Sequence, residues 1–375
     1  MYRLRPGKVI KIEKKRSGLE EALVQLDGGP EGGTGEEKAI NYPSLTGHLQ
    51  EGDSVILNTT AVRLNLGTGG RHFVFYNYRY SSLESPGKGH IMKLRYTPYQ
   101  VKVLSCEEEE SPFREHLDNT KGLNNIPVLT GELHSMLAPA AATIKYLCPG
   151  ANIVYVMTDG AALPASFSET VSRLKDSNLL SSTITAGHAF GGDLESVNIY
   201  TGLLAAREIL GADVIIITMG PGTVGTGTRY GFTGIEQGEI INAVNILEGS
   251  PVAILRISFG DSRLRHQGIS HHSLTVLGEI AQTSAAVCLP SLDEKRLDIL
   301  MNQLEENNVY ARHNVIIREG LLVEKALHYY GLEVKTMGRT LEEDRVFFEA
   351  VGSAAIYAAE LLREDNKFLL QRGGE

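Results

Sequence analysis

Apolar runs alternate with stretches of helical periodicity over residues 126–365, and this alternation limits the fold more than any other feature of the sequence. Such alternation is typical of a parallel sheet covered by helices. We therefore expect an α/β domain with a Rossmann-like, predominantly parallel sheet and helices on both faces. The predicted strands are 153–159, 182–186, 213–219, 252–259 and 286–289.

Five helices are predicted after these strands, which makes five βα units. They cover residues 167–177, 196–210, 235–247, 271–283 and 297–307. An earlier helix is expected at 131–146, and an alanine-rich helix is expected to run to about residue 362. Capping boxes are predicted at Ser166 with Glu169 and at Thr340 with Glu343. Residues 366–375 are expected to form a polar tail.

Residues 1–105 have a different pattern, with short strand-like runs separated by glycine-rich turns. The runs cover 9–12, 22–26, 54–57 and 72–76 and predict a small antiparallel β-barrel or sandwich. Within them, the glycine-rich segment 28–33 is interpreted as a hairpin tip. The acidic stretch 106–125 is expected to be a linker between the two domains.

Composition excludes some classes of protein and leaves others open. The 375 residues suit about two domains, and 45 acidic against 36 basic residues give a net charge of −9. This acidity makes nucleic acid an improbable partner, although the N-terminal module leaves room for it. Three dispersed cysteines suggest a reducing, cytoplasmic compartment, and no apolar run predicts a membrane span. A homo-oligomer is compatible with all of this.

Polar and glycine-rich turns follow four successive predicted strands. Ligands of an open parallel sheet bind at the carboxyl ends of its strands, where helix N-termini also point. The turns contain Asp159, then His188 and Asp193, then a long glycine-rich segment, and finally Asp261 with Arg263. We therefore expect one small-ligand site at this edge of the sheet.

The glycine-rich turn begins at Gly220 and reaches Gly234. It lacks the helix and downstream acid of a dinucleotide fingerprint, and Thr226 occupies the position of the phosphate-binding lysine in a P-loop. Backbone N–H groups, hydroxyls and a guanidinium can still form an anion nest. The expected ligand-binding residues are Gly220, Gly222, Thr223, Gly225, Thr226, Gly227, Thr228, Arg229, Asp261 and Arg263.

Histidine and aspartate side chains supply donors for acid/base chemistry or for a divalent metal such as zinc, manganese or iron. The candidate catalytic residues are Asp159, His188, Asp193, His271 and His272, and the first three are also the candidate metal ligands. Because His271 and His272 are adjacent on a predicted helix, their side chains should diverge by about 100° and take separate roles. His266 is a further titratable group in the turn of Asp261 and Arg263.

Three segments of the chain resemble a bacterial family of uncharacterised proteins, the domain-of-unknown-function 3866 family. They are residues 187–195, 220–229 and 268–273. The resemblance spans nearly the whole chain and implies a bacterial cytoplasmic protein in which the β module and the α/β part occur together. It implies no activity, substrate or cofactor.

Two functional hypotheses remain open. The first is a hydrolase or transferase that acts on a small anionic, phosphorylated or nucleotide-like substrate, with metal assistance as one option. The second is a non-catalytic protein that senses a metabolite or binds a partner or RNA through its β module. Arg63, Arg71, Lys88, Lys93 and Arg95, with Phe73, Phe75, Tyr76 and Tyr78, are the residues that would favour RNA.

Overall fold

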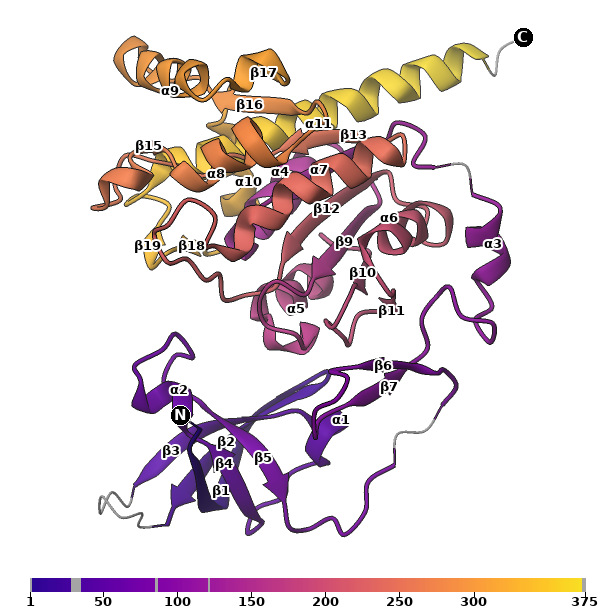
Figure 1. Ribbon diagram of the computed structural model, residues 1–375, viewed down its shortest axis with the longest axis vertical. Coiled ribbons are helices and arrows are strands. Elements are labelled where there is room, and N and C mark those ends of the chain that lie inside the picture. Colours follow the sequence, from indigo (N-terminus) through magenta and orange to yellow (C-terminus); the bar gives the residue numbers. More distant parts are fainter. Residues whose placement is uncertain (1, 28–34, 85–86, 121, 373–375) are drawn as a thin grey trace. The chain divides into compact units, whose positions relative to one another are not determined.

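The chain folds into two compact units that meet in sequence between Val103 and Leu104. The computed structural model describes residues 2–27, 35–84, 87–120 and 122–372. The first unit is a small β-barrel and the second is an α/β domain, as Figure 1 shows. Among the described residues, no helix combines the length and the apolar character needed to cross a membrane.

Five strands close the barrel in the order β1-β2-β3-β5-β4. All neighbours are antiparallel except β3 and β5, which are parallel. Side chains alternate between the interior and the surface, so that Val9, Val24 and Val55 pack into a core of their own. The strands are β1 (Leu4–Arg16), β2 (Leu19–Leu26), β3 (Glu36–Asn41), β4 (Ser54–Asn58) and β5 (His72–Asn77). The predicted barrel is confirmed, whereas the glycine-rich segment 28–33 lies outside the described residues.

Smaller elements complete the first unit and connect it to the second. They are the helices α1 (Pro43–Thr46) and α2 (Thr60–Arg63), the hairpin β6 (Ile91–Lys93) and β7 (Val101–Val103), and helix α3 (Arg114–Asp118). Helix α3 belongs to the second unit, where neighbouring Phe113 packs on a core cluster of that unit.

Eight parallel strands form the central sheet of the second unit, in the order β11-β10-β9-β12-β8-β13-β16-β17. Their runs of apolar residues are buried on both sides, as expected for a sheet covered by helices. The strands are β8 (Pro127–Gly131), β9 (Ile153–Thr158), β10 (Ser182–Thr185), β11 (Leu194–Glu195), β12 (Val214–Met219), β13 (Ser250–Ala253), β16 (Ala286–Pro290) and β17 (Asn314–Arg318). The predicted Rossmann-like α/β sheet is confirmed.

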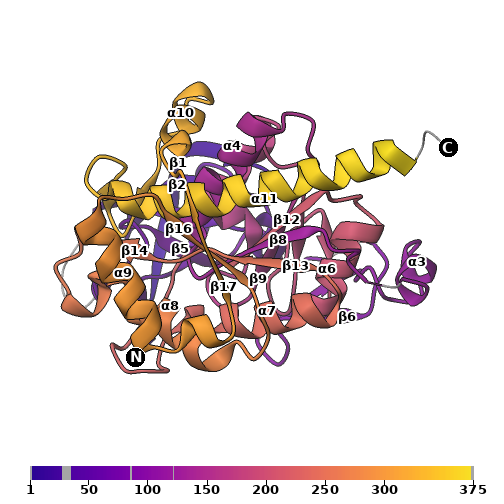
Figure 2. The ribbon, with the colours of Figure 1, turned by 90° about the horizontal axis from the view of Figure 1, so that it is seen from above.

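Helices cover both faces of this sheet. Leu129 and Ile216 point to a core shared with α4 (Leu137–Leu147), α5 (Glu169–Asp176), α10 (Leu322–Tyr329) and α11 (Arg345–Arg372). Alternate residues such as Val128 and Ile215 point to the opposite face. That face carries α6 (Ile199–Glu208), α7 (Glu236–Ile246), α8 (His271–Thr275) and α9 (Glu294–Glu306). Figure 2 shows the long helix α11 extending over the α4 side.

The structure differs from the predicted elements in several places. Strands β8 and β17 were not predicted, and the predicted strand 252–259 leaves the sheet after Ala253. Its last part forms β14 (Ile257–Ser258), which pairs with β15 (Gly268–Ile269). The cap of α5 is Ser168, not Ser166, because the Ser168 hydroxyl accepts from Val171 N. The last helix continues to Arg372, past the predicted end.

Strand β8 lies at the point where the connections change face. The chain leaves β8 towards α4 on one face, whereas its neighbours β12 and β13 lead to α7 and α8 on the other. Ligand crevices of open α/β sheets form where neighbouring connections diverge in this way. The residue that follows β8 is Glu132.

A buried glutamine holds this part of the sheet edge. Gln237 in α7 donates from Nε2 to the carbonyl oxygens of Thr130 and Ile254, at 2.8 and 3.1 Å. We expect Gln237→Ala to destabilise the protein by about 1–3 kcal/mol, because a buried acceptor loses its donor. Urea unfolding measures this loss, with the exposed Gln282→Ala as control. Equal stability of the two variants would show that the Gln237 hydrogen bonds do not contribute to the stability of the protein.

Candidate functional site

Three histidines converge beside the carboxyl end of β13. His266, His271 and His272 each offer a ligand nitrogen, and these nitrogens lie within 4.8 Å of one another. His266 ends a short 3-10 turn, while His271 and His272 begin α8. The hairpin of β14 and β15 returns the chain so that these segments meet. We call these three residues the histidine cluster.

Neighbouring groups fix the orientation of two of the rings. His266 Nδ1 lies 2.8 Å from the Ser270 hydroxyl, which also caps α8 by accepting from His272 N. The His272 ring stacks on Phe232 with 3.9 Å between ring centroids and an interplanar angle of 3°. Adjacent His271 and His272 do not diverge as expected, because their ring centroids are 4.4 Å apart. Both imidazoles therefore face one site.

Burial keeps His266 and His271 in the uncharged form that can bind a metal. Desolvation lowers the pKa of His266 to about 3, and the nearby Arg256, Arg263 and His272 contribute to this shift. Desolvation and the neighbouring His272 lower the pKa of His271 to about 4. His271 Nε2 is buried and has no hydrogen-bond partner among the described residues. At neutral pH these two imidazoles are uncharged and offer lone pairs.

A buried carboxylate lies next to the histidine cluster. Glu132 is fully buried, and neither of its carboxylate oxygens has a hydrogen-bond partner within the described part of the chain. One oxygen is 3.8 Å from His272 Nδ1 and the other is 3.6 Å from a nitrogen of Arg256. A buried carboxylate without hydrogen bonds costs several kcal/mol unless other charges compensate it. This carboxylate therefore suits a site that binds a cation.

Arginines and aspartates surround the same place, and sequence analysis had selected two of them, Asp261 and Arg263. Asp261 accepts two side-chain hydrogen bonds from Arg263, at 2.9 and 2.7 Å, and one from Arg339 at 3.3 Å. The Arg263 guanidinium holds the pKa of Asp261 well below its usual range. Arg339 also donates to Asp344, whose carboxylate accepts from the Ser258 hydroxyl. The Asp261–Arg263 pair is thus part of a network that supports the break between β13 and β14.

The glycine loop, residues 220–234, passes over the histidine cluster. A Cβ atom at Gly225 would lie 3.3 Å from the His272 ring, and one at Gly234 would clash with Glu132 at 2.8 Å. Gly227 has a φ of 78° and packs against the guanidinium of Arg265. Small residues are needed here because the backbone approaches the site closely.

Internal hydrogen bonds hold the far part of this loop. Thr226 N and Oγ1 both donate to the Gly231 carbonyl, and the hydroxyls of Thr226 and Thr228 are 2.9 Å apart. Arg229 donates to Glu279 at 2.8 and 2.6 Å, and Tyr230 donates to the same carboxylate. The Arg229 guanidinium thus points to Glu279. Of the expected ligand-binding glycines, Gly225 lies against His272 and Gly227 lies against Arg265.

Asp159 and His188 meet at a second position on this edge, after β9 and β10. The Asp159 carboxylate accepts from His188 N at 2.8 Å, and a Cβ at Gly187 would clash with it at 2.3 Å. Glu236, at the start of α7, accepts from the Thr158 hydroxyl at 2.5 Å. Burial raises the pKa of Glu236 to about 7 against the effect of that hydrogen bond, and the Asp159 charge adds to the rise.

Asp193 has a different environment. Its carboxylate accepts from Lys175 at 2.5 and 2.7 Å and from the backbone and hydroxyl of Thr183. It therefore ties the turn after β10 to α5. Among the described residues, the histidine cluster alone brings three potential metal ligands within 4.8 Å. The structure does not bring Asp159, His188 and Asp193 together in this way.

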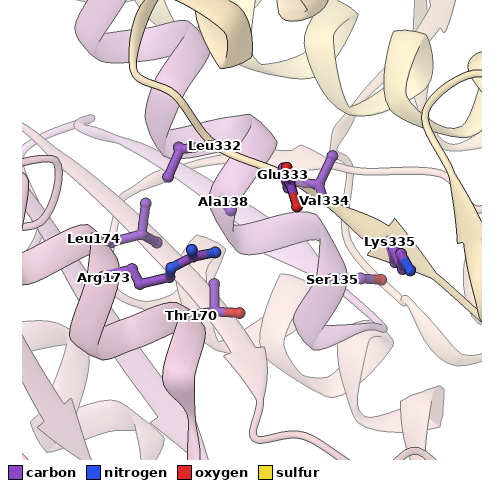
Figure 3. Close-up of a pocket in the computed structure, with 9 residues that line it drawn as sticks. All are labelled: Ser135, Ala138, Thr170, Arg173, Leu174, Leu332, Glu333, Val334 and Lys335. Atoms are coloured by element: carbon purple, nitrogen blue, oxygen red, sulfur yellow. The ribbon is translucent and has the colours of Figure 1, made fainter.

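A small cavity lies elsewhere in the unit, between α4, α5 and residues 332–335. Figure 3 shows Arg173 and Lys335 among its lining side chains, with Ser135 and Thr170. Its volume of about 70 Å³ is well below the roughly 300 Å³ at which small-molecule sites begin. We assign the candidate site to the histidine cluster because of its ligand geometry.

Sequence reasoning did not select Glu132, Arg256 or Arg339. Glu132 directly follows the short run Pro127–Gly131, and an acid at the end of a buried strand is a signal that was available. Arg256 lay within the predicted strand 252–259, whereas site residues were sought in the turns that follow strands. Arg339 lies on the two-stranded element β18 (Lys335–Thr336) and β19 (Arg339–Thr340), which no sequence pattern connects to Asp261.

The raised pKa of Glu236 predicts a pH dependence of stability. Between about pH 4.5 and 7 the unfolded chain has lost this proton and the folded chain retains it. The contribution of Glu236 to stability should therefore fall as pH rises through this window, and Glu236→Gln should not show that loss. Urea midpoints at several pH values measure it, with the exposed Glu294→Gln as control. Parallel pH profiles for Glu236→Gln and the wild type would contradict the assignment.

Comparisons with known proteins identify the family. A search of curated proteins finds no match. Among solved structures, the 54 kDa protein of the signal recognition particle from Aeropyrum pernix K1, in complex with GDP, aligns with 14% identity and a TM-score of 0.23. That alignment covers 69% of this chain and 53% of the other, so this chain spans about half of that protein. Residues 38–355 match the family described as protein of unknown function (DUF3866), and the chain therefore belongs to this family.

Proposed function

We propose that the protein is a metal-dependent enzyme, of hydrolase or transferase type, that acts on a small anionic substrate. One observation carries the proposal: three imidazole nitrogens lie within 4.8 Å of one another beside a fully buried carboxylate that accepts no hydrogen bond from the described residues. The cluster lies next to the strand end where sheet connections change face, which is the usual place of a ligand crevice.

The residues present fit zinc or another divalent metal that prefers nitrogen ligands. Three histidines with an open fourth position are a known ligand set of catalytic zinc, which supplies a water of pKa about 7 as nucleophile. Ser270 occupies Nδ1 of His266, so that Nε2 remains as its ligand atom. Glu132 faces His272 Nδ1 and would orient that ring, as carboxylates commonly do for metal-bound histidines. We therefore assign Glu132 as a positioning residue.

We propose that Arg265 binds the anionic group of the substrate. Its side chain is exposed, packs over Gly227 and is close enough to His271 to lower the pKa of that imidazole. It forms no ion pair with a described residue, unlike Arg263, which is bound to Asp261. An unpaired guanidinium beside a metal suits a phosphate or carboxylate group. Asp159, His188 and Glu236 are the proposed proton-transfer groups on the same edge.

Removal of one imidazole should abolish metal binding. We expect the wild type to bind one zinc ion, measured by elemental analysis and calorimetry, and His271→Ala to lose it. Glu132→Gln should bind about 10–100-fold more weakly, because the carboxylate orients His272. His328→Ala, which removes an exposed histidine on α10, is the control. Equal zinc binding by wild type and His271→Ala would overturn the site.

The substitution Arg265→Ala tests whether this arginine binds the anion. The zinc-loaded variant should keep its metal and bind inorganic phosphate about tenfold or more weakly than the wild type, because a charge-assisted hydrogen bond is lost. Isothermal calorimetry measures both ligands. Lys325→Ala removes an exposed cation on the opposite face of the sheet and serves as the control. Unchanged phosphate affinity in Arg265→Ala would show that Arg265 does not bind the anion. It would not contradict the metal site.

A further inference from the structure

Charge is divided unequally between the two units. Residues 1–103 contain 15 Lys and Arg against 10 Asp and Glu, a net charge of +5, whereas residues 104–375 contain 21 against 35, a net charge of −14. The overall charge of −9 therefore conceals a basic barrel. A basic module suits an anionic partner, and a polyanion gains most from several cations on one surface.

Two exposed tyrosines lie on the outer face of the barrel. Tyr76 and Tyr78 are two residues apart at the end of β5, with 44% and 62% of their surface exposed. Their ring centroids are 5.2 Å apart with an interplanar angle of 88°. Tyr2 is also exposed and contacts Phe75 from the same strand. Exposed aromatic faces of this kind can stack on unpaired bases.

Strand registers place Lys8 on the same face of the barrel as these tyrosines, two strands away. Tyr76 pairs with Ile56 of β4, which pairs with Pro6 of β1. In the next row, Tyr78 N donates to Ser54 O, and Ser54 pairs with Lys8. The outward-facing residues of β1, β4 and β5 thus form one surface.

Lys11 continues the cationic edge of this surface along β1. Lys8 and Lys11 are both exposed, and neither forms an ion pair with a described residue. We call Lys8, Lys11, Tyr76 and Tyr78 the tyrosine–lysine surface.

This surface differs from the residues that the sequence suggested for RNA. Lys93 is fully buried, and Arg71 is bound to Glu21 at 3.2 Å. Phe73 is half-buried and stacks on Tyr42. Of the aromatic residues named from the sequence, Tyr76 and Tyr78 are the ones that remain exposed.

We propose that the barrel binds single-stranded nucleic acid, with bases stacked on Tyr76 and Tyr78 and phosphates along Lys8 and Lys11. The charge of the unit selects a polyanion, and the aromatic side chains select unpaired bases over a closed duplex. Five-stranded barrels of the oligonucleotide-binding class bind single strands mainly through their second and third strands, so the likeness is an analogy of fold and not of binding face. The proposal is independent of the metal site.

The test uses the full chain and fluorescein-labelled oligonucleotides of about 12 nucleotides, the size that a single barrel covers. Anisotropy titrations compare poly-U RNA, oligo-dT DNA and a duplex of equal length. The double variant Tyr76→Ala, Tyr78→Ala should bind single strands at least about tenfold more weakly. The Tyr76→Phe, Tyr78→Phe variant keeps both rings and should bind like the wild type.

Salt dependence tests the lysines. The variant Lys8→Gln, Lys11→Gln should reduce the slope of log affinity against log salt by about 1.4, because two phosphate contacts to a single strand are lost. The control variant Lys295→Gln, Lys325→Gln changes exposed lysines of the second unit and should leave the slope unchanged.

Tyr329→Ala is the matched control for the Tyr76→Ala, Tyr78→Ala variant, because Tyr329 is 71% exposed on α10.

Three results would overturn the proposal. The first is no binding of any single strand at low salt. The second is equal binding by the wild type and the Tyr76→Ala, Tyr78→Ala variant, or equal affinity for duplex and single strand. The third is a dimer in light scattering that becomes a monomer in the tyrosine variant while oligonucleotide affinity stays the same, which would identify the surface as a contact between two copies. Thermal melting of each variant confirms that it is folded.

Discussion

The contact of Glu132 with Arg256 and His272 is the interaction on which the site of the second unit depends. It joins three segments far apart in sequence: the end of β8, the break after β13 and the start of α8. Neither contact has hydrogen-bond geometry, so the Glu132 carboxylate lies close to both groups but is incompletely satisfied. Removing one partner of such a group usually costs more than the pair contributes, because an uncompensated charge remains. The site is therefore held by a balance of charges.

The glycine loop shows how the backbone makes this arrangement accessible. Gly234 and Gly225 let the main chain approach Glu132 and His272, because a Cβ atom would clash with Glu132 at position 234 and would be tight against His272 at position 225. The network around Asp261 supports the opposite side of the site through Arg263 and Arg339. Functional sites require such supporting hydrogen bonds around the binding groups to maintain their geometry.

Much of the fold could be predicted from sequence because buried parallel strands appear as apolar runs. Strand β8 was missed because its run is short, begins with Pro127 and ends with Gly131, both of which indicate a turn. Because β8 was not predicted, Glu132, which directly follows that strand, was not selected as a site residue. His271 and His272 were selected, but the angle between adjacent residues on a helix describes where Cβ atoms point. It does not determine where two flexible imidazoles meet, and His266 joins them only through the β14–β15 pairing.

The order of strands in the sheet has a consequence for how the protein folds. Strand β8 comes first in the sequence of the second unit, yet its neighbours β12 and β13 are synthesised only after β9, β10 and β11. Pairing over such long separations is slow, because the entropy of loop closure must be overcome before the contacts form. The central strand thus remains unpaired until most of its sheet exists. The histidines come later still, so they can assemble beside Glu132 only after β12 and β13 have been synthesised.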